Sequence, residues 1–236
     1  MCNFPRPTAG AKALLEHGQV RTLFHEFGHL LHHILGGRVR YALQSGVATE
    51  WDFVEAPSQL LEEWVWDLTT LQSFARHVET GEPLPADLLR RAARAEHYGK
   101  GIWAAQQMYY AALSLELHRA DPSTLDAHAL SARLQAEMTP YPPVEDTWFE
   151  ASFGHLNGYS ALYYTYMWSL VIAKDFYERF RSDDQAAPRY RQMVLEAGGS
   201  QPAMVLVERF LGRSLSTAAF FGWLGGGAGG DSSTSA

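Results

Sequence analysis

Cysteine is almost absent from this sequence of 236 residues, which contains only Cys2. No internal disulfide can form, so the composition fits a reducing compartment and we expect a cytoplasmic protein, although a cysteine-poor secreted protein would look the same. No apolar run approaches the length of a membrane span, and residues 1–7 lack the apolar segment of a signal peptide. A membrane is therefore not an expected partner.

Positive charge is also scarce. Lys and Arg number 19 against 26 for Asp and Glu, and they form no basic block, so we expect no nucleic-acid partner. Apolar residues, in contrast, make up 47% of the chain, with seven Trp and eleven Tyr, which is enough for a sizeable core or an aromatic-lined groove. The length fits one domain over residues 1–224, and the Gly- and Ser-rich residues 225–236 are expected to form a disordered tail.

Apolar periodicity, broken by Gly and Pro, predicts a mostly α chain with little or no β-sheet. Helices are expected at about 19–35, 52–77, 86–97, 102–119, 124–138, 159–181, 184–197, 201–212 and 216–223. A weak alternation at 38–43 is the one segment that indicates a strand. The second of these helices has a capping-box spacing at 52–55 and Pro57 in its first turns.

Residues 25–29 read His-Glu-Phe-Gly-His inside the first predicted helix. Positions i and i+4 of a helix lie on the same face, so His25 and His29 can both turn an imidazole toward one metal ion. Glu26 lies beside them and can reach a water on that metal, as in the H-E-x-x-H site of zinc metallopeptidases. The alternative is a buried helix whose polar groups satisfy one another, because so short a motif also arises by chance.

A zinc ion in a hydrolase usually takes three protein ligands and one water. Carboxylates that could supply the third ligand are Glu50, Asp52, Glu55 and Glu62, and spacing alone does not choose among them. Glu55 is the best candidate because packing of its helix on the first could bring it to the histidines. Glu62, two turns further along the same face, or Asp52 could accept a hydrogen bond from a ligand histidine. The alternatives are helix capping for Asp52 and Glu55 and a solvated face for Glu62.

A histidine and three tyrosines follow one another near residue 160. Tyr159, Tyr163 and Tyr166 fall at i, i+4 and i+7, so their phenols are expected to share one helix face. A phenol aimed at the oxygen that gains charge during peptide hydrolysis is a preorganised donor, and His155 could bond substrate backbone or assist the same charge. The commoner alternative is an aromatic core stripe, but Tyr rather than Phe at all three positions favours a polar role.

Two motifs, Thr-Leu-Phe-His-Glu-Phe-Gly-His at 22–29 and Trp-Asp-Phe-Val-Glu-Ala-Pro-Ser-Gln at 51–59, carry a family resemblance. Together with Glu62, they closely resemble the thimet oligopeptidase, oligopeptidase A and mitochondrial intermediate peptidase family of zinc metallopeptidases. The resemblance implies a multi-helix metallopeptidase catalytic domain with an H-E-x-x-H helix. It also implies that His25, His29 and Glu55 ligate one Zn²⁺ ion and that Glu26 is the general base.

The stretch 153–166 is similar to the family's downstream motif, in which a His and several Tyr close the active site over the peptide. The matching positions are His155, Tyr159, Tyr163 and Tyr166, and Gly158 matches the flexible glycine segment, so His155 and Gly158 are also expected to contact substrate. Many family members have a longer, double-glycine loop between the His and the first Tyr. The spacing in this chain is more like that of the mitochondrial intermediate peptidase branch.

The resemblance implies a zinc-dependent metalloendopeptidase or oligopeptidase that hydrolyses short peptides with a metal-activated water and Glu26 as base. It covers about 3–224 but only part of the family's usual length, so we expect a C-terminal catalytic fragment or a naturally reduced form. Exposed apolar surface is then expected where the missing N-terminal portion would pack, covered by self-association or by a separate partner. The alternative is an inactive or partner-dependent fragment, a zinc-stabilised helical module without that channel wall.

Overall fold

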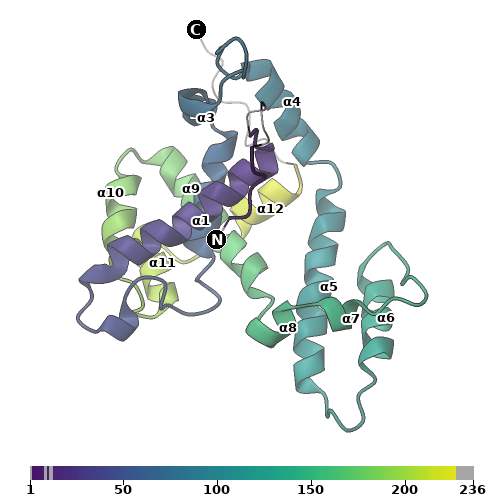
Figure 1. Cartoon of the computed structure of the whole chain (residues 1–236). Coiled ribbons are helices and arrows are strands. Elements are labelled where there is room, and N and C mark those ends of the chain that lie inside the picture. The colour runs from purple at the N-terminus through teal and green to yellow at the C-terminus, as the bar shows by residue number, and fades with distance from the viewer. Residues whose placement is uncertain (1, 8–9, 11–12, 227–236) are drawn as a thin grey trace.

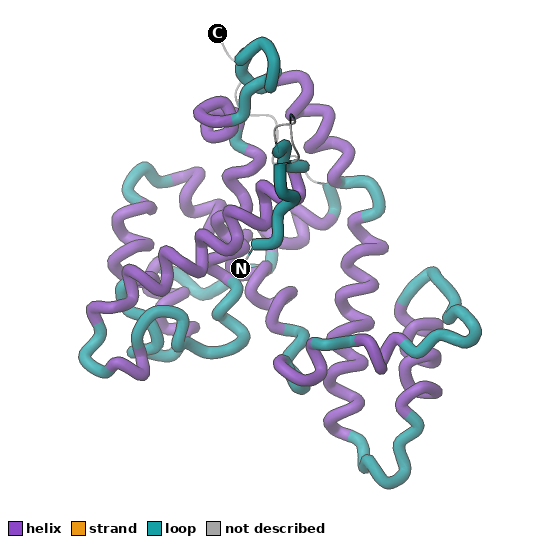
Figure 2. The backbone as a smooth tube through the Cα atoms, viewed as in Figure 1, coloured by secondary structure: helices purple, strands orange, loops and turns teal. Residues whose placement is uncertain are grey.

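The computed structural model describes residues 2–7, 10 and 13–226. Within these residues the protein is built from helices and the loops between them, and no strand is drawn in Figure 2. Their one extended pairing is an isolated antiparallel bridge between Arg76 and Pro83. The prediction of a mostly α domain with little or no sheet is confirmed. No helix in the described part is long and apolar enough to cross a membrane.

The helices have the following bounds. The α-helices are α1 (His17–Leu35), α2 (Ala56–Leu61), α3 (Leu68–Phe74), α4 (Ala86–Glu96), α5 (Lys100–Arg119), α6 (Ala127–Met138), α7 (Phe149–Ser152), α8 (His155–Gly158), α9 (Thr165–Ser182), α10 (Ala186–Tyr190), α11 (Ala203–Leu211) and α12 (Ala218–Leu224). The 3₁₀ turns are η1 (Gly36–Arg38), η2 (Ala42–Gln44) and η3 (Glu62–Trp66), and η4 (Arg191–Leu195) is a π-helical turn.

The short helix α2 lies at the centre of the arrangement. It contacts α1 and also α9, while α10, η4 and α11 close the group and α12 packs on α9. Helix α5 runs away from this group and carries α6 and α7 at its far end, where they form an arm (Figure 1). The segment that contains α8 connects the arm back to α9 (Figure 1).

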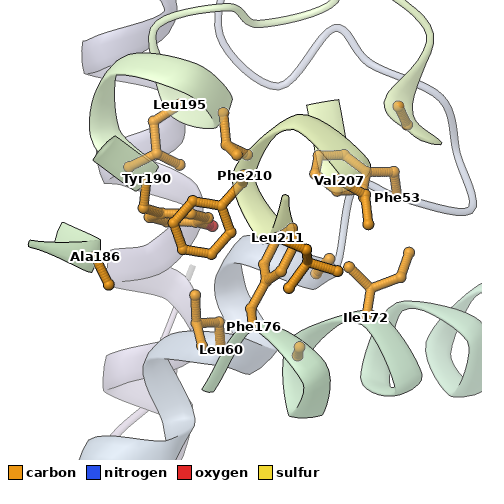
Figure 3. Close-up of a cluster of buried hydrophobic side chains, with 14 residues drawn as sticks. Phe53, Leu60, Ile172, Phe176, Ala186, Tyr190, Leu195, Val207, Phe210 and Leu211 are labelled. Atoms are coloured by element: carbon orange, nitrogen blue, oxygen red, sulfur yellow. The ribbon is translucent and has the colours of Figure 1, made fainter. Parts of the chain in front are cut away.

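The main core fixes the chain on both sides of Glu55. Phe53 and Leu60, which flank Glu55 in the sequence, are almost fully buried and pack with Ile172, Phe176 and other apolar side chains of α9, α10, η4 and α11 (Figure 3). Burial of one such side chain stabilises the fold by roughly 1.5–3 kcal/mol. The Glu55 segment is therefore held by the largest cluster of buried apolar side chains among the described residues, although Glu55 itself is polar.

A second aromatic core lies in the arm. Tyr109 and Leu113 of α5, Leu134 of α6 and Phe153 are buried together with Tyr163. Because Tyr163 comes from the segment that leads into α9, this cluster joins the arm to the region near Glu55. The arm therefore fixes one end of the segment that holds the predicted catalytic tyrosines.

The predicted helix at 52–77 is wrong in its boundaries and its continuity. Residues 51–55 form turns and α2 starts at Ala56, with Pro57 in the first turn as expected. The helix is then interrupted by η3 and by Asp67, which has an extended backbone. The Asp67 side chain caps the next helix, α3, because its Oδ1 accepts a hydrogen bond from the Thr70 N–H at 2.7 Å. The Glu55 side chain makes no capping bond, so the alternative of helix capping is not realised for this residue.

The predicted tyrosine helix at 159–181 starts later than expected. Helix α9 begins at Thr165, and Ala161 has a φ of +57°, a left-handed conformation that no right-handed helix contains. The weak strand predicted at 38–43 is absent, because η1 and η2 take up its two ends. The predicted tail lies outside the described residues except for 225 and 226, of which Gly225 follows α12 directly.

Candidate active site

Helices α1 and α2 approach each other at a glycine of the histidine motif. A Cβ atom added to Gly28 would lie 2.6 Å from the Ser58 Cα and 3.0 Å from the Pro57 carbonyl oxygen, closer than side chains tolerate. Gly28 is accordingly buried against the first turn of α2. This close approach lets His25 and His29, on either side of Gly28, reach the carboxylate that precedes α2.

His25, His29 and Glu55 come together at this contact. One carboxylate oxygen, Glu55 Oε2, lies 3.2 Å from His25 Nε2 and 3.1 Å from His29 Nε2. The three possible ligand atoms lie within 4.8 Å of one another, with Glu55 buried and the histidines half-buried. Two segments of the chain thus bring three possible metal ligands to one point, and these are the three residues that the family resemblance implies.

The donor set and its spacing suit zinc. Zn²⁺ binds imidazole and carboxylate donors at about 2.0–2.2 Å in a tetrahedron, which places neighbouring ligand atoms about 3.3 Å apart. The distances from Glu55 to the two histidines agree with this value. Three protein ligands leave a fourth position open, which is the arrangement of catalytic rather than structural zinc sites.

Glu62 orients the first histidine. Its Oε1 accepts a hydrogen bond from His25 Nδ1 at 2.7 Å, so Nε2 is the nitrogen that faces Glu55. Arg21 lies beside the second Glu62 oxygen, with its Nε 3.5 Å away. Asp52, the other predicted partner of a histidine, is engaged elsewhere, since its Oδ2 accepts from the Tyr164 hydroxyl at 3.1 Å.

Mutual hydrogen bonding controls the charges of the metal-free site. Burial alone would lower the pKa of His25, but hydrogen bonds to Glu55 and Glu62 outweigh it and raise the pKa to about 9. Burial alone would raise the pKa of Glu55, yet hydrogen bonds from His25 and His29 hold it well below its usual range. In the metal-free protein the cluster is therefore an ion pair, and a metal ion bound by these three residues would take the place of its protons.

The polypeptide around Glu55 is tied to the first turns of α9. The hydroxyl groups of Thr165 and Ser169 donate to the carbonyl oxygens of Trp51 and Asp52, the latter at 3.0 Å. In the opposite direction, Gln59 Nε2 donates to the Tyr166 carbonyl oxygen at 3.1 Å. These bonds fix the tyrosine segment relative to Glu55.

Tyr159 and Tyr166 lie beside the cluster of His25, His29 and Glu55. The Tyr159 hydroxyl donates to Glu55 Oε1 at 3.3 Å, and the two tyrosine rings lie 5.4 Å apart. Burial raises the pKa of Tyr159. Burial and a hydrogen bond donated to Tyr159 also raise the pKa of Tyr166. Both phenols therefore keep their protons at neutral pH and can donate to a negatively charged oxygen.

The other predicted residues lie at different distances from this centre. Tyr163 is buried, and its hydroxyl donates to Gln107 Oε1 of α5 at 3.0 Å, away from Glu55. Burial raises the pKa of Tyr163 to about 12.

His155 is exposed and packs edge-on against Tyr163 and Tyr166 at 5.1 and 5.7 Å between ring centroids. Gly158 is exposed with open space around its Cα, and Glu26 is half-buried on α1 between the two histidines.

Three residues that hydrogen-bond to predicted site residues were not identified from the sequence. Tyr164 holds Asp52, Gln107 holds Tyr163, and the buried Ser58 donates to Glu55 Oε2 at 3.2 Å. The spacing of Glu55 and Ser58, three residues apart across a helix start, is the one signal that could have indicated a side-chain contact. The other two contacts join distant segments and leave no local pattern.

Comparisons with known proteins identify the family of the chain. The family model described as Peptidase family M3 matches residues 1–224. The chain is 38% identical over 225 residues to "Oligopeptidase A" of Salmonella typhimurium, covering 90% of this chain and 32% of that protein. It is 35% identical over 233 residues to "Thimet-like oligopeptidase" of Dictyostelium discoideum, covering 95% and 34%. It is 35% identical over 221 residues to "Dipeptidyl carboxypeptidase" of Salmonella typhimurium, covering 90% and 32%.

The chain therefore spans about a third of the length of these curated relatives. The matched part includes both histidine and glutamate motifs and the tyrosine segment. The resemblance in the two motifs is thus confirmed over nearly the whole sequence: the chain belongs to peptidase family M3.

Proposed function

We propose that this chain is the catalytic segment of a zinc-dependent metallopeptidase that hydrolyses peptide bonds in short peptides. The observation that carries the proposal is the meeting of His25, His29 and Glu55 at the spacing of tetrahedral zinc ligands. A zinc ion in such a site polarises a peptide carbonyl and lowers the pKa of a water molecule. A cytoplasmic setting, in keeping with the single cysteine, is part of the same proposal.

The side chains around the site have separate tasks. Glu26 accepts the proton of the attacking water and passes it to the departing amine. Tyr166 or Tyr159 offers a phenol hydrogen to the oxygen that gains negative charge, and the raised pKa values of both keep those hydrogens in place. Tyr159 can do so only when its single hydrogen leaves Glu55 Oε1, whereas in the peptide-free protein it is donated to that oxygen. His155, exposed beside Tyr166, is placed to bond the peptide backbone. Tyr163 supports this group through its ring rather than its hydroxyl.

A second candidate is a catalytic segment that works only together with further polypeptide. Four large apolar side chains, Leu23, Phe27, Leu30 and Ile34, follow the 4-3-4 spacing of a helix-pairing seam on α1 and are between 42% and 62% exposed. A seam of this kind on the helix that carries two metal ligands favours a covering partner, either a second copy or a separate segment.

Glu26→Gln tests the catalytic proposal, because the amide keeps the size of the side chain and cannot take the proton. We expect the variant to retain zinc and to cleave a quenched fluorescent peptide at least about 100-fold more slowly than the wild type. Glu137→Gln is the matched control: it alters an exposed carboxylate paired with Arg133 on α6 and is expected to keep full turnover.

The outcomes separate the two candidates. Unchanged turnover in Glu26→Gln contradicts the assigned mechanism. A wild-type chain that binds zinc but cleaves nothing favours the partner-dependent candidate. A wild-type chain that binds no zinc overturns both.

A further inference from the structure

Ser58 is a buried hydroxyl in direct contact with a proposed metal ligand. It lies in the first turn of α2, is 0% exposed, and is covered by the backbone of Gly28 on α1. Its Oγ lies 2.9 Å from the Glu55 carbonyl oxygen and 3.2 Å from Glu55 Oε2. Because water cannot reach this point, no solvent molecule can take over the hydrogen bond if the hydroxyl is removed.

The two oxygens of Glu55 have different neighbours. Oε2 faces His25, His29 and the Ser58 hydroxyl. Oε1 accepts from the Tyr159 hydroxyl at 3.3 Å. A carboxylate oxygen has two lone pairs, so Oε2 can accept from Ser58 and still offer a lone pair on the side of the histidines.

The donors to Oε2 do not all persist when a metal binds. A histidine ligand binds the metal through a deprotonated nitrogen, so Nε2 of His25 and of His29 can no longer donate to Glu55. Ser58 is then the remaining side-chain donor to Oε2 among the described residues. The orientation of the carboxylate depends on this hydroxyl on one side and on Tyr159 on the other.

We propose that Ser58 is a positioning residue for the metal site: it holds the Glu55 carboxylate so that Oε2 is the oxygen presented to the metal, while Tyr159 holds Oε1 away. The inference rests on the proposed function, since it assumes that Glu55 is a zinc ligand. The competing view is that Ser58 merely satisfies the Glu55 carbonyl, as serines near helix starts often do. The two views differ in what loss of the hydroxyl does to metal affinity.

The experiment measures the zinc dissociation constant of the full chain by competition with a chromophoric chelator. We expect Ser58→Ala to raise this constant by about 10- to 100-fold, as loss of a hydrogen bond to a metal ligand typically does. Ser131→Ala is the matched control, because Ser131 is also buried and its Oγ lies 2.9 Å from the Tyr109 hydroxyl in the arm. It should lower thermal stability to a similar extent and leave zinc affinity within about twofold of wild type.

Two further measurements keep the proposal open to refutation. Ser58→Cys retains a weak hydrogen-bond donor of similar size, so its zinc affinity should lie between those of wild type and Ser58→Ala. This variant also tests the role of Ser58 if Ser58→Ala does not fold. The visible spectrum of the Co²⁺-substituted protein should change in Ser58→Ala and not in Ser131→Ala. Equal zinc affinity in Ser58→Ala, Ser131→Ala and wild type overturns the role of Ser58 and leaves the proposed function intact. A wild-type chain without zinc affinity overturns the proposed function, and the role of Ser58 with it.

Discussion

His32 lies three residues after His29 on α1 and is completely buried. Neither of its ring nitrogens has a hydrogen-bond partner among the described residues. Burial, followed by the charges of His29 and His33, lowers its pKa to about 4. The side chain is therefore neutral in the folded protein at neutral pH. It fills space in the interior, but its ring N–H is left without a hydrogen-bond acceptor among the described residues.

This burial predicts acid sensitivity. The unfolded chain binds a proton at His32 near pH 6.5, whereas the folded chain does so only near pH 4, so stability is lost as the pH falls from 6.5 to 4. We expect His32→Leu to be more stable than the wild type by about 1 kcal/mol at pH 7, because an unpaired buried group is removed. The advantage should grow by at most about 3 kcal/mol on acidification to pH 4. Urea unfolding of the two metal-free proteins at pH 7, 5.5 and 4.5 measures it, and a pH-independent difference refutes the explanation.

The contact between α1 and α2 determines whether the metal ligands meet, and Gly28 is the residue that permits it. In Gly28→Ala, the added methyl group meets the Ser58 backbone and must push the helices apart. We expect a loss of about 1–3 kcal/mol in unfolding free energy and at least a tenfold weaker zinc affinity. Chemical unfolding and chelator competition measure the two effects.

Gly18→Ala is the control for this change. Gly18 lies in the same helix with no atom near its Cβ position, so alanine there should raise stability by up to about 1 kcal/mol and leave zinc binding unchanged. Similar behaviour of the two variants would contradict the importance of the close approach.

Helices could be predicted where local and tertiary preferences agree. Helix α1 is an example, because its apolar residues recur at helical spacing up to Gly36. That His25 and His29 share one face of this helix follows from their spacing of four residues alone. The break at Asp67 and the left-handed Ala161 were not predicted, because apolar residues recur at helical spacing through both places and neither contains a Pro. In both places tertiary packing decides the backbone: Val65 is buried before the first break and Tyr163 after the second.

In the site, too, local features could be predicted from the sequence and tertiary contacts could not. His25 and His29 are local to one helix, whereas Glu55 was chosen among four carboxylates only through the family resemblance. The tyrosines were expected on one helix face, yet Tyr159 and Tyr166 come together although α9 begins between them. Their rings meet because the segment turns at Ala161 and is tied to Gln59, neither of which has a signature in the sequence.

In the molecule as a whole, the arm built on α5 is joined to the packed group of α1, α2 and α9 by the segment that contains α8 (Figure 1). The proposed metal site lies in the packed group, and Tyr159 of the joining segment reaches Glu55 there. The chain spans about a third of its relatives' length, and the apolar seam of α1 is exposed next to the site. The residues proposed for the chemistry thus all lie in this chain, while the walls that would select a peptide depend on what covers the seam.

The central claim is that His25, His29 and Glu55 hold one zinc ion. Anomalous diffraction at the zinc absorption edge, from crystals of the zinc-loaded chain, tests it most directly. We predict one strong peak within about 2.0–2.2 Å of His25 Nε2, His29 Nε2 and Glu55 Oε2. The absence of a peak there, or a peak bound only by other histidines, would contradict the account.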